Sequence, residues 1–135
     1  MQKQLALWFW RLLRWLYAAW FMYVGYIVLN KLLRGGVIHV HEPNAAAQAF
    51  SDALDASRFM DPTLAVCYLG GGTALLFHRT APLGLAILGP SVAIILLFHI
   101  FLTGMIFWGV GWAAAWLLMA WRYRKAFMSL ISYKD

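Results

Sequence analysis

The stretch from Thr80 to Trp121, TAPLGLAILGPSVAIILLFHIFLTGMIFWGVGWAAAWLLMAW, runs for 42 residues without an Asp, Glu, Lys or Arg. As a single α-helix it would be roughly 63 Å long at about 1.5 Å per residue. That is about twice the hydrocarbon thickness of a bilayer. The stretch therefore predicts two spanning helices joined by a turn. The segment LTGMIFWGVG supplies the turn, with Gly104, Gly109 and Gly111 available for it.

The whole chain shares this apolar character. Of its 135 residues, 64% are hydrophobic and 12% are charged, whereas a soluble domain carries about 25% charged residues. So few charges cannot cover a water-exposed surface, and we expect the bilayer to be the solvent. Two further charge-free gaps, 15–30 and 62–78, predict two more spans. The predicted fold is all-α: an integral membrane four-helix bundle, a single transmembrane domain over 1–135. The predicted spans are 12–33, 62–78, 82–103 and 106–124.

Basic residues are distributed unevenly about these spans. Four spans place both termini and the 78–81 link on one side. That side carries eight basic residues, namely Lys3, Arg11, Arg14, Arg79, Arg122, Arg124, Lys125 and Lys134. The other side carries three, namely Lys31, Arg34 and Arg58. The positive-inside rule predicts that both termini are cytoplasmic. We expect a multi-pass protein of a bacterial-type inner membrane. Topology alone explains the basic tail, so we expect no nucleic-acid partner.

The one long loop, 34–61, contains a pattern typical of an amphipathic helix over about 44–57. Asn44 is a suitable N-cap for this helix. We expect the helix to lie at the outer membrane surface or over the mouth of the bundle. Its apolar face consists of Phe50, Ala53, Leu54 and Ser57.

Four polar side chains fall in the same outer half of the predicted bundle: Asn30, Lys31, Tyr68 and His99. Polar groups inside a membrane are costly, so each needs a partner or a purpose. We predict that the four form a polar pocket beneath the amphipathic helix, which takes a quinone or a lipid. For His99 three interpretations stay open: a neutral imidazole bonded to a hydroxyl or a carbonyl of a neighbouring helix, a donor to a quinone or another apolar ligand, and a haem or metal ligand.

Lys31 has two interpretations of its own. A lysine at the end of a span usually extends its ammonium group to the interface. The alternative is an ion pair with Glu42, Asp61 or Asp52, which would tie the loop to the bundle.

Other chemistry has little support in the sequence. The segment HVHE (His39, His41, Glu42) is a weak metal motif, and a solvated loop is the simpler interpretation. The single cysteine, Cys67, excludes an internal disulfide and a CxxC pair, and we expect it to be a small buried apolar residue. No nucleophile with a positioned base is visible, so we do not expect an enzyme acting alone.

The triple glycine Gly70–Gly72 follows no strand and precedes no basic residue, so it is not a phosphate-binding loop. Small residues let membrane helices approach closely. We expect Gly84, Gly89 and Ser91 to face it.

Four segments, in order over about 15–103, resemble the DoxX-like family of small four-helix membrane proteins. They are FMYVGYIVLNKL, AQAFSDALDASRFMDP, AVCYLGGGTALLFHRTAPLG and LGPSVAIILLFHIFL. The resemblance implies a four-helix bundle associated with membrane redox systems, since some relatives are subunits of quinone-linked oxidoreductases. Many members carry a glutamate in the second helix where this chain has Tyr68, which speaks against a proton-coupled mechanism.

The leading functional hypothesis is a non-catalytic subunit or accessory protein of a respiratory or other redox membrane complex that contributes to a quinone or lipid pocket. Its partners would be the lipid bilayer and other membrane subunits or further copies of itself. The alternatives are an autonomous small transporter or lipid- or quinone-handling protein, and a pigment- or haem-binding subunit.

Overall fold

The structure, a computed structural model, describes residues 1–35 and 41–131, and within them it contains helices and the turns between them. The all-α class is therefore as the sequence predicts. The elements are α1 (Gln2–Arg34), α2 (Ala45–Ala56), α3 (Met60–Leu76), α4 (Ala81–Phe98), the π-helix η1 (His99–Thr103), α5 (Ile106–Arg122) and α6 (Arg124–Ile131).

Two elements differ from the predicted ranges. The first long helix begins at Gln2 rather than near residue 12, so Arg11 also lies inside α1. At the other end of the chain, the backbone at Tyr123 (φ −97°, ψ 13°) separates α5 from α6. The hydropathy pattern does not reveal α6, because charges follow the apolar run without a Gly or Pro to mark the break.

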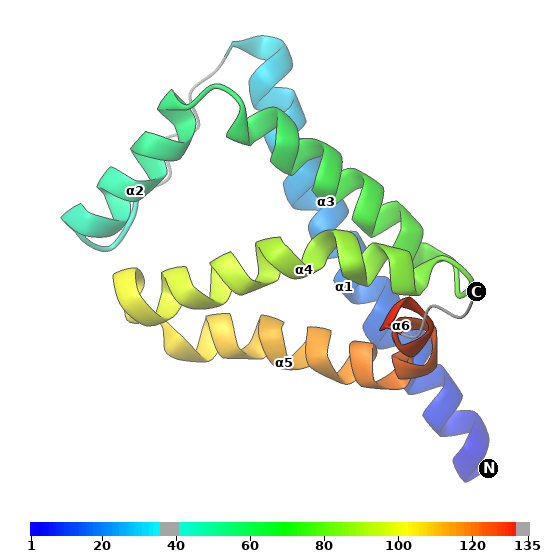
Figure 1. Cartoon of the computed structure of the whole chain (residues 1–135). Coiled ribbons are helices and arrows are strands. Elements are labelled where there is room, and N and C mark those ends of the chain that lie inside the picture. Colours follow the sequence, from blue (N-terminus) through cyan, green and yellow to red (C-terminus); the bar gives the residue numbers. More distant parts are fainter. Residues whose placement is uncertain (36–40, 132–135) are drawn as a thin grey trace.

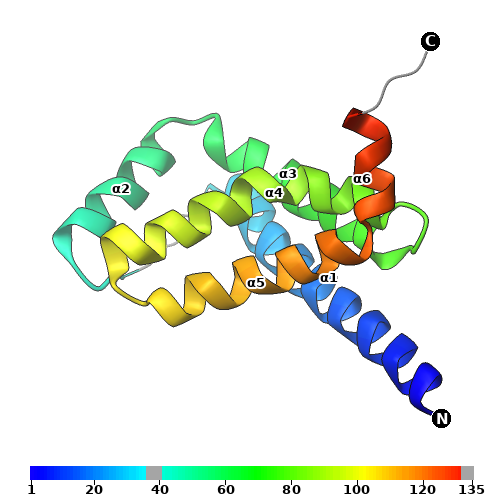
Figure 2. The ribbon, with the colours of Figure 1, turned by 60° about the horizontal axis from the view of Figure 1, so that its bottom comes forward.

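The long helices form two antiparallel pairs, α1 with α3 and α4 with α5, and α3 packs against α4 (Figure 1). The pairs meet at the end of the molecule that holds the N-terminus, the α3–α4 link and α6, and they diverge toward the opposite end (Figure 1). There α2 crosses the opening, from the start of α3 to η1 (Figure 2). The Tyr17 hydroxyl donates to the Trp112 carbonyl at 3.2 Å and joins α1 to α5.

Of the three glycines expected in the turn between the last two long helices, only Gly104 lies there, followed by Met105. Gly104 has φ +74°, in the left-handed region that favours glycine. Gly109 and Gly111 lie inside α5 instead. Gly109 packs so closely on His99 that a Cβ there would meet the His99 Cβ at 2.9 Å. The last turn before Gly104 is π-helical rather than α-helical.

The core lies where the two pairs meet. Its largest fully buried side chains are Phe21 of α1, Leu75 of α3, Leu85 and Leu88 of α4, and Met119 of α5. Large apolar side chains also cover much of the outer surface. Two stretches, Gln4–Arg34 and Ala81–Thr103, are long and apolar enough to cross a membrane.

The three glycines face different neighbours, because successive residues of an α-helix are rotated by about 100° about the helix axis. A Cβ on Gly72 would meet Met22 of α1, and one on Gly71 would meet Leu88 of α4, whereas Gly70 faces open space. Gly84 lies against Gly71, as expected, with its own Cβ position 2.6 Å from the Gly71 carbonyl oxygen. Gly89 faces Trp116 of α5 instead.

The close contact between α3 and α4 predicts opposite effects for two alanine substitutions. Gly84→Ala forces backbone apart, and we expect the free energy of unfolding to fall by about 1–2 kcal/mol. Gly70→Ala is the matched control, because it meets nothing within 4 Å and gains up to about 1 kcal/mol of helix propensity. Thermal unfolding followed by circular dichroism in one detergent measures both. Equal stability of the two variants would contradict this packing.

Candidate functional site

Three helix ends meet in one cluster of charges. Lys31 Nζ, in the last turn of α1, lies 2.7 Å from Asp55 Oδ1 of α2 and 2.8 Å from Asp61 Oδ2 in the first turn of α3. Lys31 and Asp61 are 14% and 15% exposed, so water screens their pairing less than it would on an open surface. Both positions also suit the helix dipoles, which favour cations at C-termini and anions at N-termini.

Asp61 was one of the predicted partners of Lys31, and Asp55 was not. Asp55 lies off the apolar face of α2, and only the angle at which α2 crosses brings it to Lys31. The other two expected partners bind elsewhere. Glu42 Oε1 accepts from Ser51 Oγ at 3.0 Å, and Asp52 Oδ1 accepts from Gln48 Nε2 at 2.9 Å.

Asn44 fixes the opposite end of α2. Its Oδ1 accepts from the Ala47 N–H at 2.9 Å, which is the N-cap that the sequence predicts. Its Nδ2 donates to the Leu102 carbonyl of η1. The carbonyls of a last helical turn lack helical donors, so this one is free to accept. The helix α2 is therefore tied to α1 and α3 at one end and to η1 at the other, and it acts as a brace.

A cavity of about 200 Å³ lies beneath this brace, between α3 and α4. Most of its wall is apolar. Tyr68, which is 7% exposed, and Ser91 of α4 are the two buried hydroxyl groups of this wall. The lining residues are Glu42, Phe50, Ser51, Leu54, Met60, Leu64, Tyr68, Ser91, Ile94, Ile95 and Phe98.

The four residues expected to share one pocket are divided among different environments. Tyr68 lines the cavity, and Lys31 is held in the charge cluster. Asn30 is half-buried near the end of α1. His99 Nδ1 lies 2.7 Å from the carbonyl oxygen of Ile95, four residues earlier in the adjoining α4. A carbonyl can only accept, so Nδ1 is the donor. Its Cβ packs on Gly109 of α5.

Sequence reasoning missed Ser91 as a site residue and assigned it to glycine packing. A polar residue one position after Pro90 in a long apolar run was the available signal. Of the HVHE motif, His41 and Glu42 lie within the described residues and His39 lies outside them. Within the described ranges, no three His, Cys, Asp or Glu side chains are grouped so as to hold a metal ion.

No family model, no curated protein and no solved structure matches this chain. The likeness to the DoxX-like family therefore stays a prediction, and the functional argument depends on the geometry of the chain itself.

The charge cluster predicts that Lys31 holds α2 in place. Lys31→Met leaves Asp55 and Asp61 facing each other without a cation, so α2 should open more often. We expect amide hydrogens of residues 45–56 to exchange at least about tenfold faster, equivalent to about 1.4 kcal/mol. Lys125→Met, at an exposed lysine of α6, is the control and should leave this exchange unchanged. Unaltered exchange in Lys31→Met would contradict the bracing role.

Proposed function

We propose that this chain is a multi-pass integral membrane protein in which α1, α3, α4 with η1, and α5 form a four-helix bundle of spans. The support is the apolar outer surface. The most apolar 18-residue windows of the two candidate spans are only 28% and 22% buried inside the molecule. A core helix of a soluble protein would be mostly buried, and exposed apolar area on this scale is typical of a lipid-facing surface. Helices α3 and α5, with 17 residues each, lie at the lower limit for spanning.

We further propose that both termini are cytoplasmic. Arg11, Arg14 and Arg122 gather at the end that holds the α3–α4 link. Asp55 and Asp61 lie at the opposite end with Lys31. This polarity follows the positive-inside rule.

For a membrane protein with this topology, the proposed function is that of a non-catalytic accessory protein that binds an apolar group beneath α2. The cavity carries this proposal, because α2, which is tied at both ends, covers one side of it. Its volume of about 200 Å³ compares with the roughly 150 Å³ that accommodates benzene in an engineered cavity. It therefore fits one ring, such as a quinone head, or a short length of acyl chain. Tyr68 and Ser91 provide hydroxyl donors for a carbonyl or ester oxygen.

Membership of a respiratory or other redox complex is the more specific form of this proposal. It rests on the resemblance to DoxX-like proteins. An autonomous lipid or quinone carrier would use the same cavity without partner chains.

A pigment or haem subunit is a second candidate, favoured by one observation. The bond from His99 Nδ1 to the Ile95 carbonyl leaves Nε2 with its lone pair available to a ligand. Hydrogen bonding of the other ring nitrogen is common among metal-ligating histidines.

The membrane arrangement predicts opposite labelling at two sites. In a Cys67→Ala background, Ser129→Cys lies on α6 and Asp52→Cys on α2, and both positions are exposed. A membrane-impermeant maleimide should label position 52 from outside intact cells and position 129 only in inverted vesicles. Labelling of both positions from the same side would contradict the topology.

The cavity predicts a bound apolar molecule that a larger side chain displaces. Native mass spectrometry of the protein from its own membrane, in mild detergent, should show a bound lipid or quinone in the wild type. We expect Leu54→Trp, which fills the cavity, to reduce its occupancy at least about tenfold. Val66→Trp is the control, because Val66 is 72% exposed on α3.

The same spectra test the rest of the proposal. Stoichiometric membrane partner chains would support the accessory role, whereas a lone monomer or homo-oligomer with bound ligand would indicate an autonomous carrier. Equal ligand occupancy in both tryptophan variants would contradict the cavity as the site. In a separate measurement, a visible absorption band of the purified wild-type protein that is lost in His99→Ala would favour the pigment or haem candidate.

A further inference from the structure

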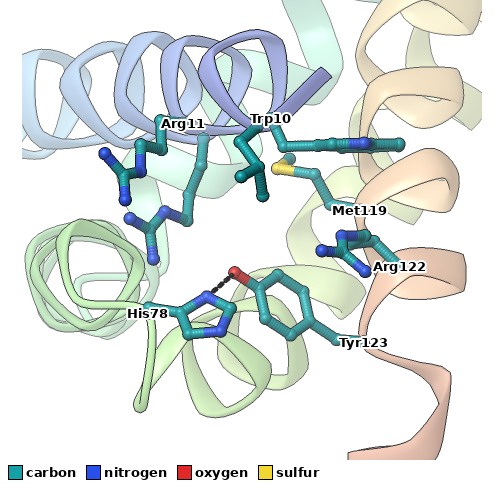
Figure 3. Close-up of a pocket in the computed structure, with 8 residues that line it drawn as sticks. Trp10, Arg11, His78, Met119, Arg122 and Tyr123 are labelled. Atoms are coloured by element: carbon teal, nitrogen blue, oxygen red, sulfur yellow. Dashed lines mark hydrogen bonds between the residues drawn. The ribbon is translucent and has the colours of Figure 1, made fainter. Parts of the chain in front are cut away.

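A second cavity, of about 230 Å³, lies at the opposite end of the molecule from α2. The first half of α1, the α3–α4 link and the α5–α6 junction meet there. Figure 3 shows Arg11 of α1, His78 of the link, and Arg122 and Tyr123 at the end of α5 arranged around it. Arg14 of α1 also lines the cavity.

Arg14 is buried, whereas Arg11, Arg79 and Arg122 at the same end are exposed. Its residue is 6% exposed, and its Nη1 has no hydrogen-bond partner among residues 1–35 and 41–131. An arginine guanidinium stays protonated in proteins, so it cannot escape the cost of burial by becoming neutral. A buried charge without a partner is strongly unfavourable. An anion bound in this cavity would provide the partner that the Arg14 guanidinium lacks.

The described chain supplies no carboxylate for this purpose. Its four acidic side chains are Glu42, Asp52, Asp55 and Asp61, and they belong to the loop, α2 and the start of α3. The fifth in the sequence, Asp135, lies outside the described residues. The positive-inside rule does not account for the geometry either, because topology requires cations near the membrane and not a guanidinium buried in a cavity.

The other wall residues indicate which anion fits. Three guanidiniums around one cavity suit the oxygens of a phosphate, which arginine binds through two parallel N–H···O bonds. The Tyr123 hydroxyl, which lies 2.9 Å from His78 Nδ1, is a further hydrogen-bonding group in the wall. Trp10 and Met119 contribute apolar surface beside the charges.

A neighbouring cavity of about 450 Å³ shares His78, Arg122 and Tyr123 with the cavity around Arg14. It also has Arg124 and Lys125 in its wall. The basic surface therefore continues beyond Arg14 and has room for a substituent on the phosphate.

We propose that this basic cavity is a phosphate-binding site in which Arg14, with Arg11 and Arg122, holds a phosphate group, either the headgroup of an anionic lipid or a free phosphate compound. The site is separate from the cavity beneath α2. Its test does not depend on the function proposed above.

The experiment uses full-length, delipidated protein in detergent, with native mass spectrometry as the readout. The probes are dioleoyl phosphatidic acid, dioleoylglycerol, which has the same chains without phosphate, and sodium phosphate. We expect one phosphatidic acid to bind in preference to dioleoylglycerol. Arg14→Gln should weaken that binding by about tenfold or more. Arg79→Gln removes the same charge from an exposed residue of the α3–α4 link and should change it by less than about twofold.

Competition distinguishes the two sources of phosphate. Displacement of phosphatidic acid by millimolar sodium phosphate would assign the site to a free phosphate compound, and resistance to displacement would assign it to a lipid headgroup. Arg122→Gln, at an exposed wall residue, keeps the test decisive if Arg14→Gln does not fold, and we expect a severalfold loss. Equal binding of phosphatidic acid and dioleoylglycerol, or equal effects of the cavity variants and Arg79→Gln, would overturn the proposal.

Discussion

The ion pairs of Lys31 with Asp55 and Asp61 are the contacts on which the α2 end of the structure depends. The two helix pairs diverge toward this end, so they do not close it by packing against each other (Figure 1). A short helix spans the opening instead. Because α2 is only 12 residues long, it would be marginal as an isolated helix. Its attachments at Lys31 and Leu102 position it, and they thereby create the cavity that it covers.

The two ends of the molecule satisfy their charges in different ways. At the α2 end, a cation from one helix and two carboxylates from others neutralise one another within the chain. At the opposite end, three arginines surround a cavity without a described carboxylate. Internal pairing favours a fixed structural role, whereas unpaired buried charge favours recognition of an external anion. The proposed apolar site and the proposed phosphate site therefore differ in chemistry as well as in position.

Between the two ends, the helices are held by small residues and aromatic rings. Gly71 and Gly84 let α3 and α4 touch through their backbones. Where α1 approaches α5, the rings of Trp20 and Trp112 stack with centroids 5.1 Å apart. Both contacts bury area without needing polar partners. Such packing does not require an apolar interior and a polar exterior. It therefore suits a protein whose outer surface is also apolar.

The sequence by itself determined the all-α class, the approximate ranges of most of the long helices, a glycine turn within 102–111 and the cap at Asn44. These features depend on local properties: runs of apolar residues too long for one helix, glycine's tolerance of positive φ, and an asparagine side chain that reaches its own helix. The polar site could be predicted only in part. Tyr68 lines a mostly apolar cavity beneath α2, whereas Lys31 pairs with Asp55 and Asp61, and His99 bonds to the Ile95 carbonyl. Arg14 was assigned to topology, although it is buried. Tertiary structure alone decided the partners of Lys31 and the burial of Arg14, because both depend on the angles at which helices cross, and hydropathy carries no information about those angles.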